Sequence, residues 1–527
     1  MLELVKKNIH MNRWKGNATS QITLDDDFIV PDTMDDVDQI ILSSGEITIE
    51  SVKIQAERVA VRGKLDFTLL YRGAEGGLQV LSGNIHFEEP INVPKLEEKD
   101  YVQLLWDLED LNAGIINSRK LNVKAIVTLQ AKVETAYDVD AAVEVNATAV
   151  GKDIPKVEIL RRSVDVASIA LRHKDTFRIK DTIALSGNKT NIDHILWTEM
   201  KLRGVNVRPM EEKAALEGEL LVFIIYQGEG EGTPMQWLEE SIPFSGELNV
   251  SGMTEDMVPS VTYHLIHKDV EASPDADGEM RELDADAVLE LDMKLYREEN
   301  MELLGDLYST NRELTLQTTE ACFDKILTKN MSKCKLVEKV NLDHADKILQ
   351  ICHSEGTVKI DEMSVKDDGL FVEGALEVRL LYMTADDAQP IQSAVEDVPF
   401  HFLIEAPGID QSTVNQLNPG LEQLSAVMLG GGAIEIKASI SLDLLALQPI
   451  CEPIIAGASE APMDFKNLQN MPGIVGYIVQ PGDTLWKIAK KFHTTIDTIM
   501  ETNGLTGREV EAGNRLILVK EMGSAAS

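Results

Sequence analysis

The chain has 527 residues, of which 88 are acidic and 50 are basic, so its formal net charge at pH 7 is −38. Hydrophobic residues make up 44% of the chain, which is enough for several buried cores and excludes global disorder. An isoelectric point near 4.6 argues against nucleic acid or an anionic membrane as a partner of the surface as a whole.

The first twenty residues, MLELVKKNIHMNRWKGNATS, contain no apolar run of about 7–15 residues, so no secretory signal is expected there. The sequence nowhere holds about 18 consecutive apolar residues, so no membrane-spanning helix is expected either. The four cysteines do not indicate a disulfide framework. These features together predict a protein kept in a reducing cytoplasm.

A pattern of eleven residues occurs three times. It is VRGKLDFTLLY from residue 61, LEGELLVFIIY from residue 216 and VEGALEVRLLY from residue 372. The glycines lie 155 and 156 residues apart, and a tyrosine follows each one eight positions later. Each pattern also has an aspartate upstream and a phenylalanine downstream, namely Asp38 and Phe87, Asp193 and Phe244, and Asp346 and Phe400. The period is too long for a solenoid and predicts three tandem copies of one domain.

Apolar and polar residues alternate within each copy, for example over 121–133 and 283–295. This period of two predicts half-buried antiparallel strands. The glycine-rich stretch 227–234 predicts a hairpin loop. We therefore predict a mainly β chain of three tandem β-sandwich-like domains, with a short helix or turn around Asp38, Asp193 and Asp346.

The predicted domains span residues 1–140, 155–298 and 313–448. Residues 452–476 hold three prolines, three glycines and little periodicity, so they are predicted to be a linker. The remaining segment, 477–520, has six basic and five acidic residues, so the acidity of the chain belongs to the repeats.

Residues 477–520 predict a small β-α-α-β module. Thr484 can cap a helix whose apolar positions begin at Leu485, and Thr494 or Thr495 can cap a second helix. The second helix is expected to end at Asn503-Gly504, a favourable C-terminal pair. Short strands at 477–479 and 516–519 complete the module.

This pattern resembles the LysM family over the whole module, through Tyr477, the run Gly482–Leu485, Phe492, Asn503 and Gly513 among others. The resemblance implies binding of N-acetylglucosamine polymers, chiefly peptidoglycan, in a groove between the first strand–helix turn and the loop after the second helix. The groove residues that it implies are Gly482, Asp483, Thr484, Leu485, Trp486, Asn503, Gly504 and Leu505. For Trp486, stacking on a sugar and packing against protein are both open.

Three repeats followed by a LysM module resemble clostridial spore-coat morphogenetic proteins of the SipL type. That resemblance implies a mother-cell scaffold or adaptor at the forespore surface, in the cytoplasm, which tethers the coat's basement-layer morphogenetic ATPase. It also implies that the LysM module binds a protein partner as well as, or instead of, peptidoglycan.

No catalytic motif stands out in the sequence. Gly63-Lys64 lacks the remainder of a phosphate-binding loop, and the residues Cys322, Cys334, His344, Cys352 and His353 have no zinc-module spacing, so core thiols and strand-edge histidines are preferred there. We therefore predict no enzyme activity, no metal and no cofactor. The alternatives are a plain peptidoglycan-binding protein and a LysM-targeted cell-wall hydrolase.

Overall fold

The computed structural model describes residues 2–519 except 148–153, 231–232, 234, 343–347, 367, 387–390, 430–432 and 464–472. Repeat 1 holds strands β1 (Leu2–Ile29), β2 (Val37–Gln55), β3 (Arg58–Gly73), β4 (Leu78–Asn92), β5 (Tyr101–Asn117) and β6 (Lys120–Ala147). Repeat 2 holds β7 (Val157–Ala184), β8 (Ile192–Met210), β9 (Lys213–Gly228), β10 (Gln236–Asn249), β11 (Val258–Pro274) and β12 (Met280–Ser309). Repeat 3 holds β13 (Arg312–Asn341), β14 (Ile348–Lys366), β15 (Gly369–Thr384), β16 (Ile391–Glu405), β17 (Val414–Met428) and β18 (Ala433–Pro462).

Each repeat is a sandwich of two antiparallel sheets, which confirms the predicted mainly β fold. In repeat 1 the strand orders are β1-β6-β5 and β2-β3-β4, and the other two repeats have the same arrangement. Alternate residues of both sheets fill one apolar core in each repeat. The sheet β11-β12-β7 of repeat 2 and the sheet β13-β18-β17 of repeat 3 join through a single residue pair, Ala167 with Asp324, into one six-stranded sheet.

The shared glycine and phenylalanine of the repeats are cross-strand partners. Gly63 pairs with Phe87, and the same pairing recurs at Gly218 with Phe244 and at Gly374 with Phe400. A Cβ atom on Gly63 would lie 2.7 Å from the Phe87 ring, so the ring needs a neighbour without a side chain. The tyrosine of each pattern is buried and forms a hydrogen bond through its hydroxyl group, as Tyr71 does with Gln79 at 2.8 Å.

The predicted helix or turn at the start of the first two copies is a strand instead. Asp38 lies in β2 and Asp193 lies in β8, where the pairing register shifts by one residue. A β-bulge of this kind breaks the alternation of apolar and polar residues, which hides the strand from a pattern-based prediction. Asp346 lies outside the described residues.

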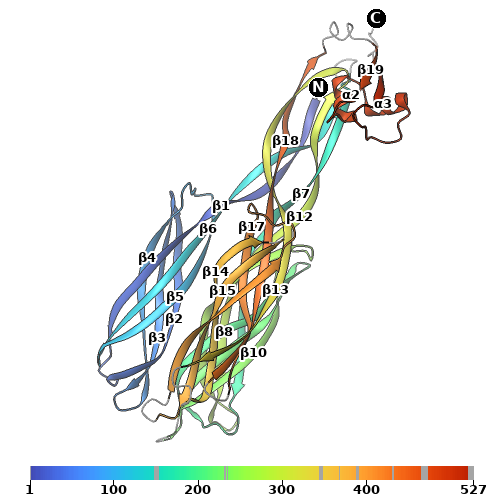
Figure 1. Cartoon of the computed structure of the whole chain (residues 1–527). Coiled ribbons are helices and arrows are strands. Elements are labelled where there is room, and N and C mark those ends of the chain that lie inside the picture. Colours follow the sequence, from blue (N-terminus) through green and yellow to red (C-terminus); the bar gives the residue numbers. More distant parts are fainter. Residues whose placement is uncertain are drawn as a thin grey trace.

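The first and last strands of each repeat are 28–30 residues long and extend beyond the sandwich as a two-stranded ribbon. Figure 1 shows the three ribbons twisted together above the sandwiches. They meet in an apolar cluster, here called the ribbon core, whose buried members are Ile9, Met11, Val139, Ala141, Val164, Val166, Met301, Leu303, Ala321, Phe323 and Ile454. The repeats therefore run past the predicted ends at 140, 298 and 448.

Part of the predicted linker is also ribbon. Residues 452–462 continue β18 and pair with β13, as Pro453 does with Glu320. Prolines are tolerated there because β17 pairs with β18 only as far as Leu447, which leaves that edge of β18 without a strand from β17. The proline and glycine content and the weak periodicity therefore gave the wrong assignment for these eleven residues.

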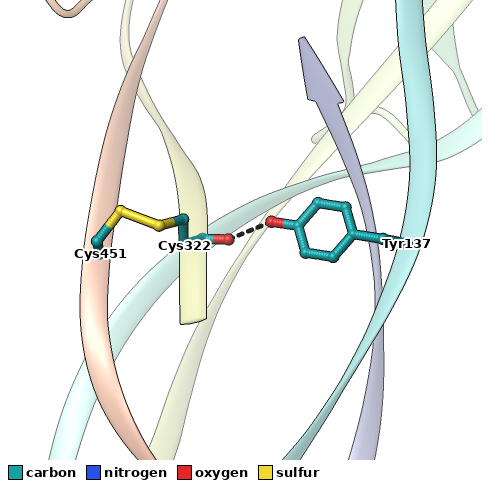
Figure 2. Close-up of a disulfide and its surroundings, with 3 residues drawn as sticks. All are labelled: Tyr137, Cys322 and Cys451. Atoms are coloured by element: carbon teal, nitrogen blue, oxygen red, sulfur yellow. Dashed lines mark hydrogen bonds between the residues drawn. A yellow bond between two sulfur atoms is a disulfide. The ribbon is translucent and has the colours of Figure 1, made fainter. Parts of the chain in front are cut away.

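The cysteine prediction is wrong for one pair. Cys322 on β13 and Cys451 on β18 form a disulfide across the ribbon of repeat 3 (Figure 2). The Tyr137 hydroxyl of repeat 1 donates a hydrogen bond to the Cys322 carbonyl, so the bridge lies where two ribbons touch. The partners are 129 residues apart, and spacing gave no sign of them. Cys334 and Cys352 are buried free thiols, as predicted.

Candidate functional site: the C-terminal head

The C-terminal module, here called the head, folds as β19 (Ile474–Ile478), α2 (Leu485–Lys491), α3 (Ile496–Asn503) and β20 (Arg515–Val519). Thr484 and Thr495 cap the two helices by accepting hydrogen bonds from the amides of Lys487 and Thr498. Gly504 ends α3 in the left-handed conformation, with φ of 63°. The β-α-α-β prediction is thereby confirmed. Neither helix of the described residues is long and apolar enough to span a membrane.

The first predicted groove wall is the turn before α2. Gly482 and Thr484 are exposed there, whereas Leu485 is 2% exposed and belongs to the core of the head. Asp483 stabilises the turn, because it accepts hydrogen bonds from the Tyr477 hydroxyl at 2.6 Å and from the Gln480 amide at 2.9 Å. These two bonds hold the pKa of Asp483 below its usual value. The backbone of this turn is therefore preorganised, and its exposed part is Gly482 and Thr484.

The second predicted wall is the loop after α3. The Asn503 side chain donates to the carbonyls of Ile499 and Ile517 at 2.8 Å each and accepts from the Ile517 amide at 2.7 Å. This side chain therefore joins α3 to β20, while Leu505 packs partly against the core. Gly504 is exposed between them. Of this wall, the backbone near Gly504 is what a ligand can reach.

Trp486 is turned toward the repeats. It is 8% exposed, its indole Nε1 donates to the Asp306 carboxylate at 2.8 Å, and its ring lies edge-on to Tyr308 at 4.9 Å. In this conformation the indole is therefore engaged by protein, and stacking on a sugar would require the head to move away.

The surface of repeat 2 that holds the head is the end of β12, here called the seat and formed by Asp306 and Tyr308. Asp306 also accepts from the Lys490 ammonium at 2.6 Å, and the Tyr308 hydroxyl donates to the Thr494 carbonyl at 2.8 Å. Tyr308 counts among the core residues of the head. Sequence reasoning missed both residues, because they belong to a ribbon that was predicted to end earlier. Figure 1 shows the head beside the tip of the ribbons.

An apolar face of the head points away from its core. Ile474, Ile478 and Ile517 are 67%, 56% and 50% exposed, and they lie on one face of the β19–β20 pair, where Ile517 is opposite Gly476, midway between the other two. We call them the isoleucine face. Their alternation with buried residues such as Leu516 and Leu518 is visible in the sequence and could have identified this face.

A cluster of charged residues lies between the three sandwiches, at the end of the molecule away from the head, here called the wide end. There the sheets β2-β3-β4, β10-β9-β8 and β14-β15-β16 meet. Its members, here called the axis cluster, are Glu199, Lys201, Glu239, His353, Glu355 and Arg379. His353 is 7% exposed, stacks on Phe223 at 4.0 Å and contacts Glu239 at 2.5 Å and Glu199 at 3.6 Å. It was predicted to be a strand-edge histidine, and the structure instead buries it between repeats. His344 lies outside the described residues.

Comparison with protein families gives two kinds of match. The SipL, SPOCS domain matches residues 36–116, 191–273 and 347–429, and the LysM domain matches residues 477–519. Each SPOCS match runs from the second strand of a repeat into the fifth, so it lies within one sandwich. Neither of these domains is catalytic, and no enzymatic domain was detected. Searches of curated proteins and of solved structures found no significant match.

Proposed function

From a chain that carries three SipL SPOCS domains and a C-terminal LysM domain, we propose a non-enzymatic scaffold or adaptor of the endospore coat. The SipL domains associate the chain with the spore coat, and the LysM domain implies peptidoglycan binding. In our proposal the protein acts in the mother-cell cytoplasm and links the coat's basement-layer morphogenetic ATPase to the forespore surface.

The observation that carries this proposal is the position of the head. It lies at the tip of a long acidic body, and contacts from Trp486, Lys490 and Thr494 hold it there. The isoleucine face and the exposed turns at Gly482 and Gly504 are not part of these contacts. A body that presents a small binding domain in this way suits an adaptor between two assemblies.

We assign the two accessible parts of the head to two partners. Exposed backbone at Gly482, Thr484 and Gly504 suits the N-acetyl groups of peptidoglycan, which need hydrogen-bond donors and acceptors. The isoleucine face suits a protein partner, because three clustered exposed isoleucines are costly to leave in water. A plain peptidoglycan-binding protein is the second candidate, and the exposed turns favour it.

The test uses the purified full chain against two probes, the morphogenetic ATPase and peptidoglycan sacculi. We expect the wild-type chain to retain the ATPase, and we expect Ile478→Ser with Ile517→Ser to weaken retention at least tenfold. The matched control is Val427→Ser, a change at a 51%-exposed position on β17 of the body, which should bind like the wild type. Binding to sacculi with no binding to the ATPase would contradict the adaptor role, and release of muropeptides would contradict the absence of enzyme activity.

The proposed compartment has its own test in the disulfide. Disulfides are rare in a reducing cytoplasm, so Cys322 and Cys451 should be thiols while the protein is in the mother cell. We expect alkylation of intact sporulating cells to label both residues early and neither residue in released spores. Labelling of neither at the early stage would contradict the cytoplasmic location.

A further inference from the structure

A cleft of about 720 Å³ separates repeats 1 and 2 at the wide end of the molecule. Its walls come from β2, β3, β4 and β5 of repeat 1 and from β8 and β11 of repeat 2. The cleft lies in the acidic body rather than in the head, so a role for it is independent of the function proposed for the LysM domain.

Aromatic side chains line this cleft. Trp106 of repeat 1 stacks on His264 of repeat 2, with ring centroids 4.5 Å apart and an interplanar angle of 22°. Trp197 also lines the cleft, is only 4% exposed, and its indole Nε1 has no hydrogen-bond partner among the described residues. A buried indole N–H without a partner is uncommon in a closed core, because the lost hydrogen bond costs about 1–3 kcal/mol. This donor becomes available to a ligand in the cleft only if the indole moves, because Trp197 packs in the apolar cluster that includes Phe223 and Leu381.

The charge of the cleft is negative. Its lining holds five carboxylates and two lysines, namely Glu46, Asp66, Asp107, Glu199 and Asp269 with Lys201 and Lys268. Lys268 is paired with Glu46 at 2.9 Å, and Lys201 is paired with Glu355 at 2.6 Å. Asp107 and Asp269 form no ion pair among the described residues. Desolvation by the surrounding repeats raises the pKa of Asp107, and the nearby Lys359 ammonium only partly offsets this effect.

These features are specific to the first two repeats. Trp106, Tyr263 and Pro419 occupy the same register position, opposite Leu129, Leu291 and Leu442. At the next position the three repeats have Asp107, His264 and Gly420. Repeat 3 thus has neither an aromatic ring nor a charge where repeats 1 and 2 form the cleft. The three copies share their packing residues but differ here, which is typical of a site rather than of a fold requirement.

We propose that this cleft binds a basic, extended segment of a protein partner. A lysine or arginine head group would neutralise Asp107 and Asp269, and its aliphatic stem would lie along the edge of the stacked Trp106–His264 pair. A backbone carbonyl of the segment would accept from Trp197 once the side chain moves enough to admit it. Polyanions are repelled by the same carboxylates, and a neutral glycan would leave the two unpaired carboxylates uncompensated.

The test measures binding of a fluorescent peptide of alternating lysine and leucine to the full chain. We expect Asp107→Asn with Asp269→Asn to weaken binding at least tenfold. The matched control is Glu362→Gln with Glu373→Gln, which removes the same amount of charge from two exposed carboxylates that face each other across β14 and β15. This control should bind within about twofold of the wild type, because surface charges far from a site are largely screened at physiological salt.

Trp106→Leu gives a second readout, since it should weaken the peptide while leaving the charge unchanged. Thermal unfolding of each variant checks that it folds. If Trp106→Leu does not fold, Asp107→Asn still tests the proposal. Equal weakening by both double variants would overturn the proposal, because it would mean unspecific attraction to an acidic surface. Binding of chitin oligosaccharides in the cleft without binding of the peptide would overturn it as well.

Discussion

The three repeats contact one another in two regions, namely the ribbons, here called the narrow end, and the sandwiches at the wide end. Different kinds of side chain are buried in these two regions. At the narrow end the ribbon core is apolar, and the ion pairs around it, such as Lys325 with Asp165, are about 40% exposed. At the wide end the axis cluster places His353, Glu199 and Glu355 in the interior, at 6%, 13% and 12% side-chain exposure. The wide end also has an apolar cluster, which includes Leu42, Trp197 and Leu381. Packing therefore contributes at both ends, whereas only the wide end also depends on which buried groups carry a proton. Repeats with one fold can thus be joined by two kinds of contact.

The strongest effect should come from removing a ring from the ribbon core. Phe323 is 1% exposed and packs among residues from all three repeats. Phe323→Ala should lower the free energy of unfolding by about 3–5 kcal/mol, since the ring leaves a cavity that rigid ribbons cannot fill. Chemical denaturation with a probe in each repeat measures this change.

The matched control for that variant lies on the same strand. Val337 on β13 is 62% exposed, and Val337→Ala should change the free energy of unfolding by less than about 0.5 kcal/mol. If Phe323→Ala destabilises repeat 3 alone, the ribbons do not couple the repeats, and the comparison between the two ends fails.

The next effect is a dependence on pH that belongs to the wide end. Burial lowers the pKa of His353, but its contacts with Glu199 and Glu239 outweigh burial and raise the pKa to about 9, from 6.5 in the unfolded chain. The folded state therefore holds this proton more tightly than the unfolded state. The resulting stability, of about 3 kcal/mol, is fully present below pH 6.5 and is lost as the pH rises through 9.

Urea denaturation at several pH values between 6 and 10 measures this loss. Lys201, Glu355 and Arg379 belong to the same cluster, so their titration is coupled to that of His353. The experiment therefore compares the pH dependence of stability between variants and assigns no pKa to a single group. His353→Leu should remove most of the slope between pH 6.5 and 9, whereas His267→Gln, at an exposed position on β11, should keep it. An unchanged slope in His353→Leu would show that the wide end is not held by this proton.

Internal repetition made much of the fold predictable. The glycine, tyrosine and phenylalanine of each copy were visible as landmarks, and the structure explains them as a cross-strand pair and a buried hydroxyl group. Capping residues such as Thr484 and Gly504 gave the helix ends of the head correctly. Such features depend on neighbours in sequence or on one adjacent strand, and local pattern carries that information.

Contacts between repeats were not predictable in the same way. The register position that holds His353 at the axis holds Leu42 in repeat 1 and Trp197 in repeat 2, so comparison of the copies suggested no common role. The disulfide and the seat at Asp306 both join segments more than 100 residues apart. Of the predicted groove residues, Trp486, Asp483 and Asn503 proved to be engaged within the chain, because a polar or aromatic side chain in a motif can serve the fold as well as a ligand.

The weakest effect concerns the seat of the head, which adds polar contacts to a narrow end whose core is apolar. Asp306→Ala removes the acceptor of both Trp486 and Lys490, and hydrogen bonds to a charged group are worth about 1.5–3 kcal/mol. The head should then leave its seat more often while the repeats keep their unfolding midpoint.

The five tryptophans give five indole N–H signals in a spectrum of the ¹⁵N-Trp-labelled chain, and the Trp486 signal should exchange with solvent at least tenfold faster. Asp497→Ala, at an exposed position in the first turn of α3, should leave it unchanged. A Trp486 signal that stays protected in Asp306→Ala would mean that the contacts of Tyr308, namely its ring against Trp486 and its hydrogen bond to the Thr494 carbonyl, hold the head without Asp306.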